Sequence, residues 1–217
     1  MASLGVPPRF LAPFLISLAL LLSGAGLARG DVLVQYTFPI PTTDPSQRTG
    51  PGFAATTVDD YAMATDVSLS DGLPVPGENF IDDRSPMYGR PVLRIDPGAG
   101  STTPALAVAN GTYLEFTLTA DDGFFLDLDN LMFGGARGGS GTPRGWVVRS
   151  SVDGFATNIA TADLTTVRAD LKLYTVDLSD PAYTDLTEIV FRIYSYAPAA
   201  GNSVEFVDVT VNGISHP

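Results

Sequence analysis

Hydrophobic and polar residues alternate over many short stretches of the chain, and after residue 30 no long stretch repeats its apolar positions at helical spacing. Alternation with a period of two is typical of strands that bury one face. Gly, Pro, Asp and Asn separate the stretches, as expected for turns. The pattern predicts an all-β protein of about ten short strands, arranged as a two-sheet antiparallel sandwich of jelly-roll kind.

The same alternation predicts which side chains form the core. In the first half these are Val32, Val34, Tyr36, Phe38, Leu114, Phe116, Leu118, Phe124, Leu126 and Leu128. The phase changes at Asp129-Asn130, which indicates a bulge or a break between strands, and Leu131 and Phe133 then point inward. The later core positions are Tyr174, Val176, Leu178, Ile189, Phe191, Ile193, Val207, Val209 and Val211. Trp146, the only tryptophan, shares the parity of Val148 and is therefore predicted in the core.

Two segments interrupt the pattern. Residues 70–104 are rich in proline and predict a long irregular surface excursion with one short strand near Val92–Ile95. Residues 134–145 are rich in glycine and predict a loop between strands. No Lys-Ser/Thr pair and no helical pattern follow this glycine-rich segment, so it does not read as a phosphate-binding loop.

The first 30 residues have the form of a helical signal peptide. Arg9 and the amino terminus provide positive charge, a short apolar run follows, and small residues allow cleavage after Ala28 or Gly30. The apolar run is too short to span a bilayer, although an uncleaved N-terminal anchor remains an alternative. The leader predicts a secreted, extracellular or periplasmic protein with no membrane attachment after cleavage. We expect residues 31–217 to form a single domain.

Composition excludes several classes of function. The chain has no cysteine, which removes disulfides and thiolate sites, and its single histidine is His216. With one imidazole near the end of the chain, zinc and copper sites lack ligands and serine-type catalysis lacks a base. The net charge of −12 opposes binding to nucleic acid and anionic membranes. Most of the acids are aspartates, which suit either turns or hard cations such as Ca²⁺.

Two kinds of acidic site remain to be weighed. Glycoside cleavage requires only two suitably spaced carboxylates, so a glycan-cleaving enzyme stays open as an alternative. The compact Glu-x-Asp-x-x-Glu strand of laminarinase-like jelly rolls is absent. Residues Asp127-Leu128-Asp129-Asn130 are similar to the start of a calcium loop, but the glycine and the distal glutamate of an EF-hand are missing. No catalytic residue is predicted.

The polar positions of several predicted strands form the candidate ligand face. Its members are Tyr113, Glu115, Arg149, Arg192, Tyr194 and Tyr196. If these strands share a sheet, guanidinium groups, tyrosine rings and a carboxylate meet on its outward side. Aromatic rings stack on the apolar face of a sugar while polar groups bind its hydroxyls. The alternative is that the arginines pair with acids on neighbouring strands and the tyrosines simply cover the sheet.

Several of these segments together resemble one bacterial group. They are Tyr113–Leu118, Leu126–Phe133, Trp146–Phe155, Val190–Tyr196 and Val207–Gly213. The chain resembles exported β-sandwich ectodomains, jelly-roll and carbohydrate-binding-like, of the kind found upstream of PEP-CTERM or other C-terminal sorting tails. The match covers about residues 112–213 well and the first half weakly. No Pro-Glu-Pro motif, apolar helix or basic tail follows the last strand, which favours free secretion over surface sorting.

The resemblance also implies a structural calcium. In similar carbohydrate-binding jelly rolls such an ion often joins the first and last strands. Asp208 matches the position of one ligand, and Asp31 is expected to lie near it, by resemblance only.

These observations lead to one hypothesis and two alternatives. The chain is expected to be a secreted, non-catalytic binding or matrix module whose partner is a polysaccharide or a cell-surface glycan. The first alternative is a purely structural protein of the envelope or extracellular matrix without a small ligand. The second is a glycan-cleaving enzyme that uses a carboxylate pair.

Overall fold

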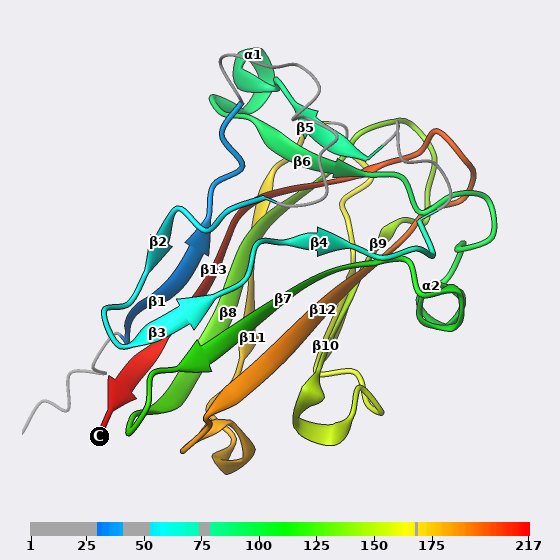
Figure 1. Ribbon diagram of the computed structural model, residues 1–217. Helices are drawn as coiled ribbons and strands as arrows, with labels where there is room; N and C mark the ends of the chain where they lie inside the picture. The colour runs from blue at the N-terminus through cyan, green and yellow to red at the C-terminus, as the bar shows by residue number, and fades with distance from the viewer. Residues whose placement is uncertain (1–29, 41–52, 74–78, 168) are drawn as a thin grey trace, which may run out of the picture.

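The computed structural model describes residues 30–40, 53–73, 79–167 and 169–217, which form a sandwich of two antiparallel β-sheets (Figure 1). The predicted all-β class is therefore confirmed. The predicted signal peptide lies outside the described residues except for Gly30, and it stays a prediction. Within the described ranges, the helices are all too short to cross a membrane.

The first sheet has seven strands. They are β1 (Asp31–Tyr36), β2 (Thr57–Val58), β5 (Phe80–Asp82), β6 (Val92–Ile95), β8 (Phe125–Arg137), β11 (Lys172–Asp177) and β13 (Val204–His216). The order is β11-β8-β13-β1-β2, while β6 also pairs with β13 and β5 pairs with β6. The long β8–β13 ladder runs from the Arg137–Val204 pair to the Phe125–His216 pair.

The second sheet has six strands. They are β3 (Ala62–Ala64), β4 (Ser68–Leu69), β7 (Tyr113–Ala120), β9 (Gly145–Ser150), β10 (Ala160–Asp163) and β12 (Glu188–Tyr196). The order is β10-β9-β12-β7-β3, with β4 also paired to β7. The chain passes back and forth between the two sheets along its length, as in a jelly roll.

Within the described residues, four short helical segments join the strands. They are α1 (Ser85–Tyr88), α2 (Pro104–Asn110), η3 (Ser151–Asp153) and η4 (Pro181–Tyr183). Thr103 caps the start of α2, and its Oγ1 accepts a hydrogen bond from Leu106 N at 3.2 Å. The helix ends at Gly111, which adopts a φ of +64°. Although the sequence did not predict it, α2 lies beside β12 and β9 on the six-stranded sheet (Figure 1).

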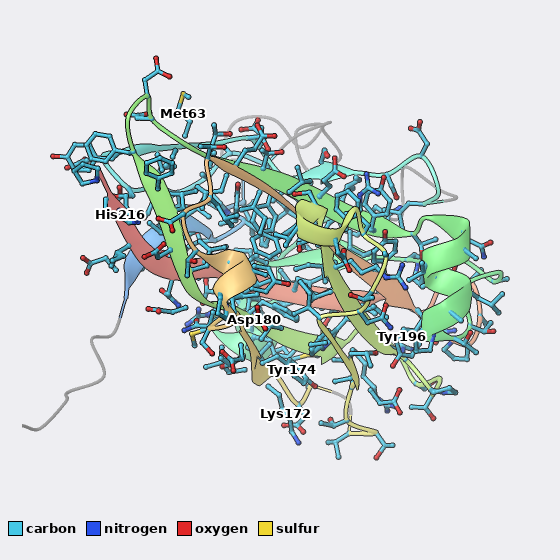
Figure 2. All side chains as sticks on the ribbon, turned by 90° about the horizontal axis from the view of Figure 1, so that it is seen from below. Met63, Lys172, Tyr174, Asp180, Tyr196 and His216 are labelled. Carbon is cyan, nitrogen blue, oxygen red and sulfur yellow. The ribbon has the colours of Figure 1, made fainter. Side chains whose placement is uncertain are left out.

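Inner-facing side chains of both sheets form one continuous core between the layers (Figure 2). Trp146 is buried there, with its ring 4.9 Å from Phe133 and 5.1 Å from Tyr174, as its parity predicts. The phase change at Asp129 is confirmed as a bulge, because the β13 register shifts between Asn212 and Gly213 opposite this point. The hydrophobic core thus follows the alternating pattern across both sheets.

Two core predictions are wrong, because the strands contain irregularities that the pattern did not reveal. The register of β1 shifts between Val32 and Val34, so Val32 lies 37% exposed rather than in the core. The register of β13 shifts after Val207, where Asp208 adopts a φ of +49°. Val207 is therefore buried on the opposite side of the sheet from Phe206, since one extra residue reverses the alternation.

The two predicted irregular segments are more ordered than expected. Val92–Ile95 is the expected short strand, but β5 also pairs with it and both join the seven-stranded sheet. Gly134 and Gly135 belong to β8 rather than to a loop. A Cβ at Gly134 would lie 2.3 Å from Val207 Cγ2, and one at Gly135 would lie 2.9 Å from Tyr174 Cε2. These glycines therefore admit neighbouring side chains within a strand.

Candidate functional site

Arg192 occupies the centre of the outer face of the six-stranded sheet. In the strand register it lies opposite Glu115 of β7 on one side and Arg149 of β9 on the other. The prediction that the two arginines share one layer is therefore confirmed. Arg192 Nε donates to Glu115 Oε2 at 2.6 Å, and its guanidinium lies 4.6 Å from the Tyr113 ring centre and 3.7 Å from that of Phe155.

These contacts keep Arg192 charged and in place. Burial lowers the pKa of its guanidinium, but the hydrogen bond to Glu115 raises it, and the net shift is upward. The two aromatic rings add cation–π attraction. The face of the guanidinium that a ligand would stack on is thus already occupied by Tyr113 and Phe155.

Arg149 is also committed to partners within the chain. Its Nε donates to Asn158 Oδ1 at 2.7 Å, and its Nη1 donates to Phe155 O at 2.7 Å. Both acceptors belong to the segment that follows η3. Arg149 therefore fixes the segment whose Phe155 ring covers Arg192.

Tyr194 and Tyr196 are 3% and 1% exposed, so the expectation that they lie on a solvent-exposed surface is wrong. Both pack with Ala107 of α2, which covers this end of the sheet. The Tyr196 hydroxyl donates to Asp163 Oδ1 at 2.5 Å and lies 3.1 Å from Ala162 O. Burial raises the pKa of the Tyr196 phenol, and the contact with Asp163 raises it further. Of the predicted tyrosines, only Tyr113 remains partly exposed.

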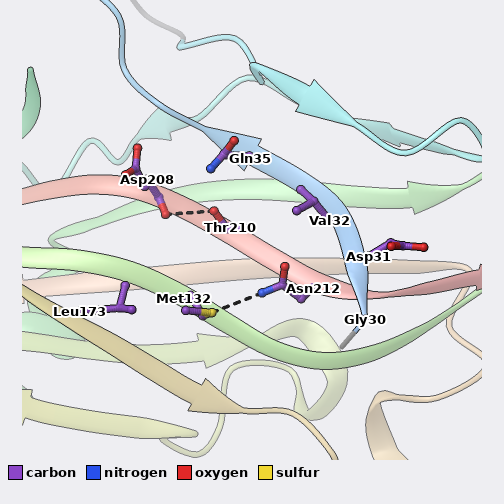
Figure 3. Close-up of a pocket in the computed structure, with 9 residues that line it drawn as sticks. All are labelled: Gly30, Asp31, Val32, Gln35, Met132, Leu173, Asp208, Thr210 and Asn212. Atoms are coloured by element: carbon purple, nitrogen blue, oxygen red, sulfur yellow. Dashed lines mark hydrogen bonds between the residues drawn. The ribbon is translucent and has the colours of Figure 1, made fainter. Parts of the chain in front are cut away.

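The outer face of the seven-stranded sheet carries an open groove of about 570 Å³ that crosses β1, β13, β8 and β11 (Figure 3). Its lining residues are Gly30, Asp31, Val32, Gln35, Met132, Leu173, Asp208, Thr210 and Asn212. Leu173 is 66% exposed, and Val32 is exposed because of the shift in β1. The groove thus combines apolar walls with amide, hydroxyl and carboxylate groups.

The polar groups of the groove come from the outward positions of two paired strands. Gln35 on β1 pairs in register with Thr210 on β13. Asn212 Nδ2 donates to Asn130 Oδ1 at 2.8 Å and lies 3.4 Å from Met132 Sδ. The sequence analysis did not single out these residues, although Thr210 and Asn212 alternate with Val209 and Val211. That alternation is the signal that identifies them.

Asp208 and Asp31, the predicted calcium ligands, both line the groove but lie at its opposite ends (Figure 3). Asp31 pairs with Gly213, whereas Asp208 precedes Val209, the partner of Tyr36. Asp208 is five residue steps from Gly213, which corresponds to about 17 Å along a strand. Asp208 also forms an ion pair with Arg90. This arrangement does not bring the two carboxylates around one ion, and calcium binding stays a prediction.

The glycan-cleaving alternative requires two facing carboxylates, but Glu115 and Glu205 lie in different sheets. Glu115 is bound to Arg192, while Glu205 is 1% exposed and accepts hydrogen bonds from Arg84 Nε at 3.2 Å and Tyr88 Oη at 2.8 Å. These two carboxylates therefore do not face each other across a shared groove, as cleavage of a glycosidic bond requires.

Comparisons with known proteins give structural likeness at low identity. No protein-family model matches the chain, and no curated protein matches it in sequence. A carbohydrate-binding module specific for non-crystalline cellulose, CBM28, is 14% identical, covers 68% of this chain and 88% of its own, and gives a TM-score of 0.42. TmCBM61, in complex with beta-1,4-galactotriose, is 13% identical over 76% of this chain and 95% of its own, with a TM-score of 0.37.

The K3 cleaved adhesin domain of Lys-gingipain from Porphyromonas gingivalis is 15% identical, covers 57% of this chain and 74% of its own, and gives a TM-score of 0.34. Two of these proteins are carbohydrate-binding modules and the third is an adhesin domain. At such identities, the function of this chain has to be argued from its own residues.

Proposed function

We propose that the protein is a secreted, non-catalytic module that binds an uncharged polysaccharide in the groove of the seven-stranded sheet. The observation that carries the proposal is the open groove of about 570 Å³ with both apolar and polar lining. Ligand sites commonly fall between about 300 and 1,000 Å³ and combine apolar walls with a few polar groups. The groove has both properties.

The lining chemistry suits a sugar ring with free hydroxyls. Leu173 and Val32 offer apolar surface to the ring, while Gln35 and Asn212 offer amide groups to its hydroxyls. Asp31 accepts hydrogen bonds but repels anions, and the chain as a whole carries a charge of −12. These features favour a neutral glycan over an acidic one.

The groove also replaces the arginine face as the proposed ligand surface. On that face Arg192 is bound to Glu115, and Arg149 donates a hydrogen bond to Phe155 O. Tyr194 and Tyr196 are buried in a cluster with Ala107 of α2. A ligand on that face would first have to displace these contacts. The groove also contains internal contacts, between Asn212 and Asn130 and between Asp208 and Arg90, but Leu173 and Val32 stay exposed beside them.

The test is a pull-down of the full-length chain on insoluble neutral polysaccharides, followed by calorimetric titration with soluble oligosaccharides of the one that binds. The groove variant combines Gln35→Ala with Leu173→Ala, two partly or largely exposed positions whose substitution leaves the fold intact. The matched control is Arg192→Ala on the opposite outer face. We expect the groove variant to bind about tenfold more weakly or worse, because it lacks the apolar surface of Leu173 and the amide of Gln35. A tenfold loss corresponds to about 1.4 kcal/mol of binding free energy.

The possible results separate the hypotheses. Binding that survives in the groove variant but disappears in Arg192→Ala would show that the ligand binds the outer face of the six-stranded sheet, around Arg192 and Arg149. Absence of binding to every polysaccharide, together with self-association of the chain, would support a purely structural role in the envelope or matrix. Release of reducing sugar ends from a bound glycan would show an enzyme.

A further inference from the structure

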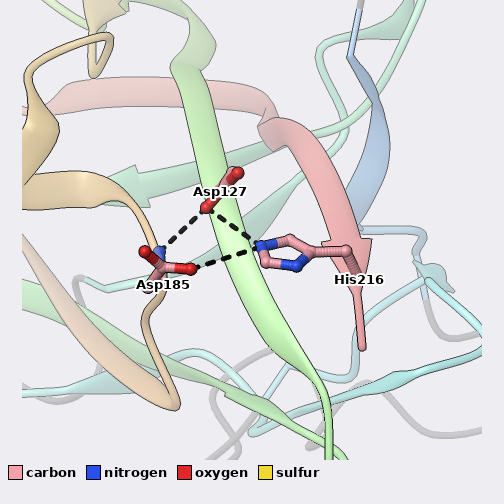
Figure 4. A group of neighbouring side chains, drawn as sticks. All are labelled: Asp127, Asp185 and His216. Atoms are coloured by element: carbon pink, nitrogen blue, oxygen red, sulfur yellow. Dashed lines mark hydrogen bonds and ion pairs between the residues drawn. The ribbon is translucent and has the colours of Figure 1, made fainter.

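Asp127, Asp185 and His216 come together at one end of the seven-stranded sheet, away from the groove (Figure 4). His216 pairs with Phe125 in the β8–β13 ladder, and Asp127 lies two residues further along β8 on the same face. His216 is therefore held in a strand. Residues 216 and 127 meet because of the register of this ladder.

Asp185 is brought to the same place by a separate contact. Leu186 forms an isolated bridge with Leu126, with hydrogen bonds of 2.9 and 3.1 Å between their backbones. In addition, Asp185 N donates to Asp127 Oδ1 at 2.8 Å. Three segments that are distant in the sequence thus present one imidazole and two carboxylates to a common point.

The distances within the cluster fit three ligands of one metal ion. His216 Nε2 lies 3.3 Å from Asp127 Oδ1 and 3.7 Å from Asp185 Oδ1, and one ligand atom of each residue lies within 4.8 Å of the others. Oxygen and nitrogen ligands about 2.0–2.2 Å from a tetrahedral ion are about 3.3–3.6 Å apart. An N–H···O hydrogen bond is shorter, at about 2.9–3.0 Å.

The orientation of the imidazole also fits a metal ligand. His216 Nε2 is shielded from solvent and faces both carboxylates, while the side chain as a whole is 31% exposed. His216 Nδ1 lies 3.3 Å from Pro217 O. A proton on Nδ1 that is donated to this oxygen leaves the lone pair of Nε2 directed at the two carboxylates. Metal-binding histidines are commonly oriented by a backbone oxygen in this way.

The composition led us to expect no zinc site, but the grouping of one imidazole with two carboxylates changes that expectation. We propose that Asp127, Asp185 and His216 bind one divalent transition-metal ion of the Zn²⁺ class. Mixed imidazole and carboxylate ligands suit such an ion, whereas Ca²⁺ and Mg²⁺ prefer oxygen ligands alone. Three protein ligands leave the fourth tetrahedral position to water. The ion joins β8, β13 and the segment around Asp185, so its binding stabilises the end of the last strand.

The competing arrangement is a protonated His216 that forms ion pairs with both carboxylates and binds no metal. The two arrangements respond differently to zinc, since only the first offers a site for it. A bound ion stabilises the folded chain in proportion to the logarithm of its concentration above the dissociation constant.

The test is titration of the full-length chain, without a polyhistidine tag, with Zn²⁺ at neutral pH. Calorimetry measures stoichiometry and affinity, and thermal unfolding with and without a chelator measures stabilisation. We expect one Zn²⁺ per chain, a higher Tm that the chelator reverses, and a visible absorption spectrum of tetrahedral coordination with Co²⁺. Asp185→Asn and His216→Gln should each weaken binding at least tenfold. Asp71→Asn, a matched control at an exposed acid that follows β4, should not.

Three results would overturn the proposal. The first is the absence of binding heat and of any Tm shift with millimolar Zn²⁺. The second is equal zinc affinity in His216→Gln and the original chain, which would indicate general attraction to an acidic surface. The third is Ca²⁺ binding at this position that does not depend on His216.

Discussion

The two outer faces of the sandwich are built by the same strand alternation, but one is covered by other segments and the other stays open to solvent. On the six-stranded sheet, α2 covers Tyr194 and Tyr196, and aromatic rings enclose Arg192. On the seven-stranded sheet, Leu173 and the polar residues beside it stay open to solvent in the groove. Alternation determines which side chains point outward, whereas the connecting segments determine which of these remain exposed.

The difference shows why residue type alone is a poor guide to the ligand face. Arginine and tyrosine are typical of binding sites, but here they hold α2 and the segment at Phe155 in place. The groove instead uses glutamine, asparagine, threonine and aliphatic side chains. If this comparison is correct, substitutions on the first face should affect stability, and substitutions on the second should affect binding.

The largest expected effect comes from truncating Tyr196. Tyr196→Ala should lower the free energy of unfolding by about 3–5 kcal/mol, because it removes a buried ring and opens a cavity beneath α2. Leu173→Ala in the groove should change it by about 0.5 kcal/mol or less, since the side chain is largely exposed. Urea unfolding measures both. Similar losses in the two variants would contradict the distinction between the covered and open faces.

The main strands could be predicted from the sequence, because one face of each is buried over much of its length and the apolar positions alternate there. The short strands β2, β3, β4, β5 and β10 were not predicted. The predictions of core residues failed where a strand contains an irregularity in its pairing register. At Asp208 the backbone adopts a positive φ, which is uncommon for residues other than glycine and leaves no mark in the hydrophobic pattern. Because one extra residue reverses the side that each residue faces, Val207 was assigned to the wrong side.

The candidate sites were less predictable, because they depend on contacts between distant segments. The short α2 helix gives too few residues for a periodic pattern, so its cover over Tyr194 and Tyr196 was not foreseen. The groove requires the relative order of β11, β8, β13 and β1, which alternation does not provide. Likewise, only the β8–β13 register brings His216 close to Asp127.

The second prediction concerns the ion pairs of the two faces. Arg192→Ala should destabilise the protein by about 1–2 kcal/mol, because it loses contacts with two rings and with Glu115. Arg90→Ala breaks the more exposed pair with Asp208 and should cost about 0.5 kcal/mol or less. Denaturant unfolding of both variants provides the comparison. A larger loss for Arg90→Ala would show that the seven-stranded face is the more tightly fixed one.

The third prediction concerns the N-terminal cap of α2, the helix that lies beside β12 and β9. Thr103→Ala removes the hydroxyl that accepts a hydrogen bond from Leu106 N and should cost about 1 kcal/mol. Hydrogen exchange should accelerate in α2 while the β8–β13 ladder keeps its protection. Thr103→Ser, which retains the hydroxyl, is the matched control. Unchanged exchange in α2 would mean that packing on Tyr194 and Tyr196, rather than the cap, holds the helix.

The smallest effect is a change in pH dependence at Tyr196. Burial raises the pKa of its phenol in the folded protein above that of the unfolded chain, which lies near 10. Above that pH the unfolded chain loses the proton while the folded protein keeps it, so ionisation favours unfolding and stability falls as pH rises. Tyr196→Phe lacks this contribution.

The stability difference between the original protein and Tyr196→Phe therefore isolates this one phenol, because every other ionising group is common to both. Near neutral pH the variant should be about 1 kcal/mol less stable, since it loses the hydroxyl contacts with Asp163 and Ala162. The difference should shrink between about pH 9 and pH 11. Tyr61→Phe, at a ring that is 49% exposed, serves as the control. A constant difference for Tyr196→Phe across this range would mean that solvent reaches the phenol and that α2 does not seal this face.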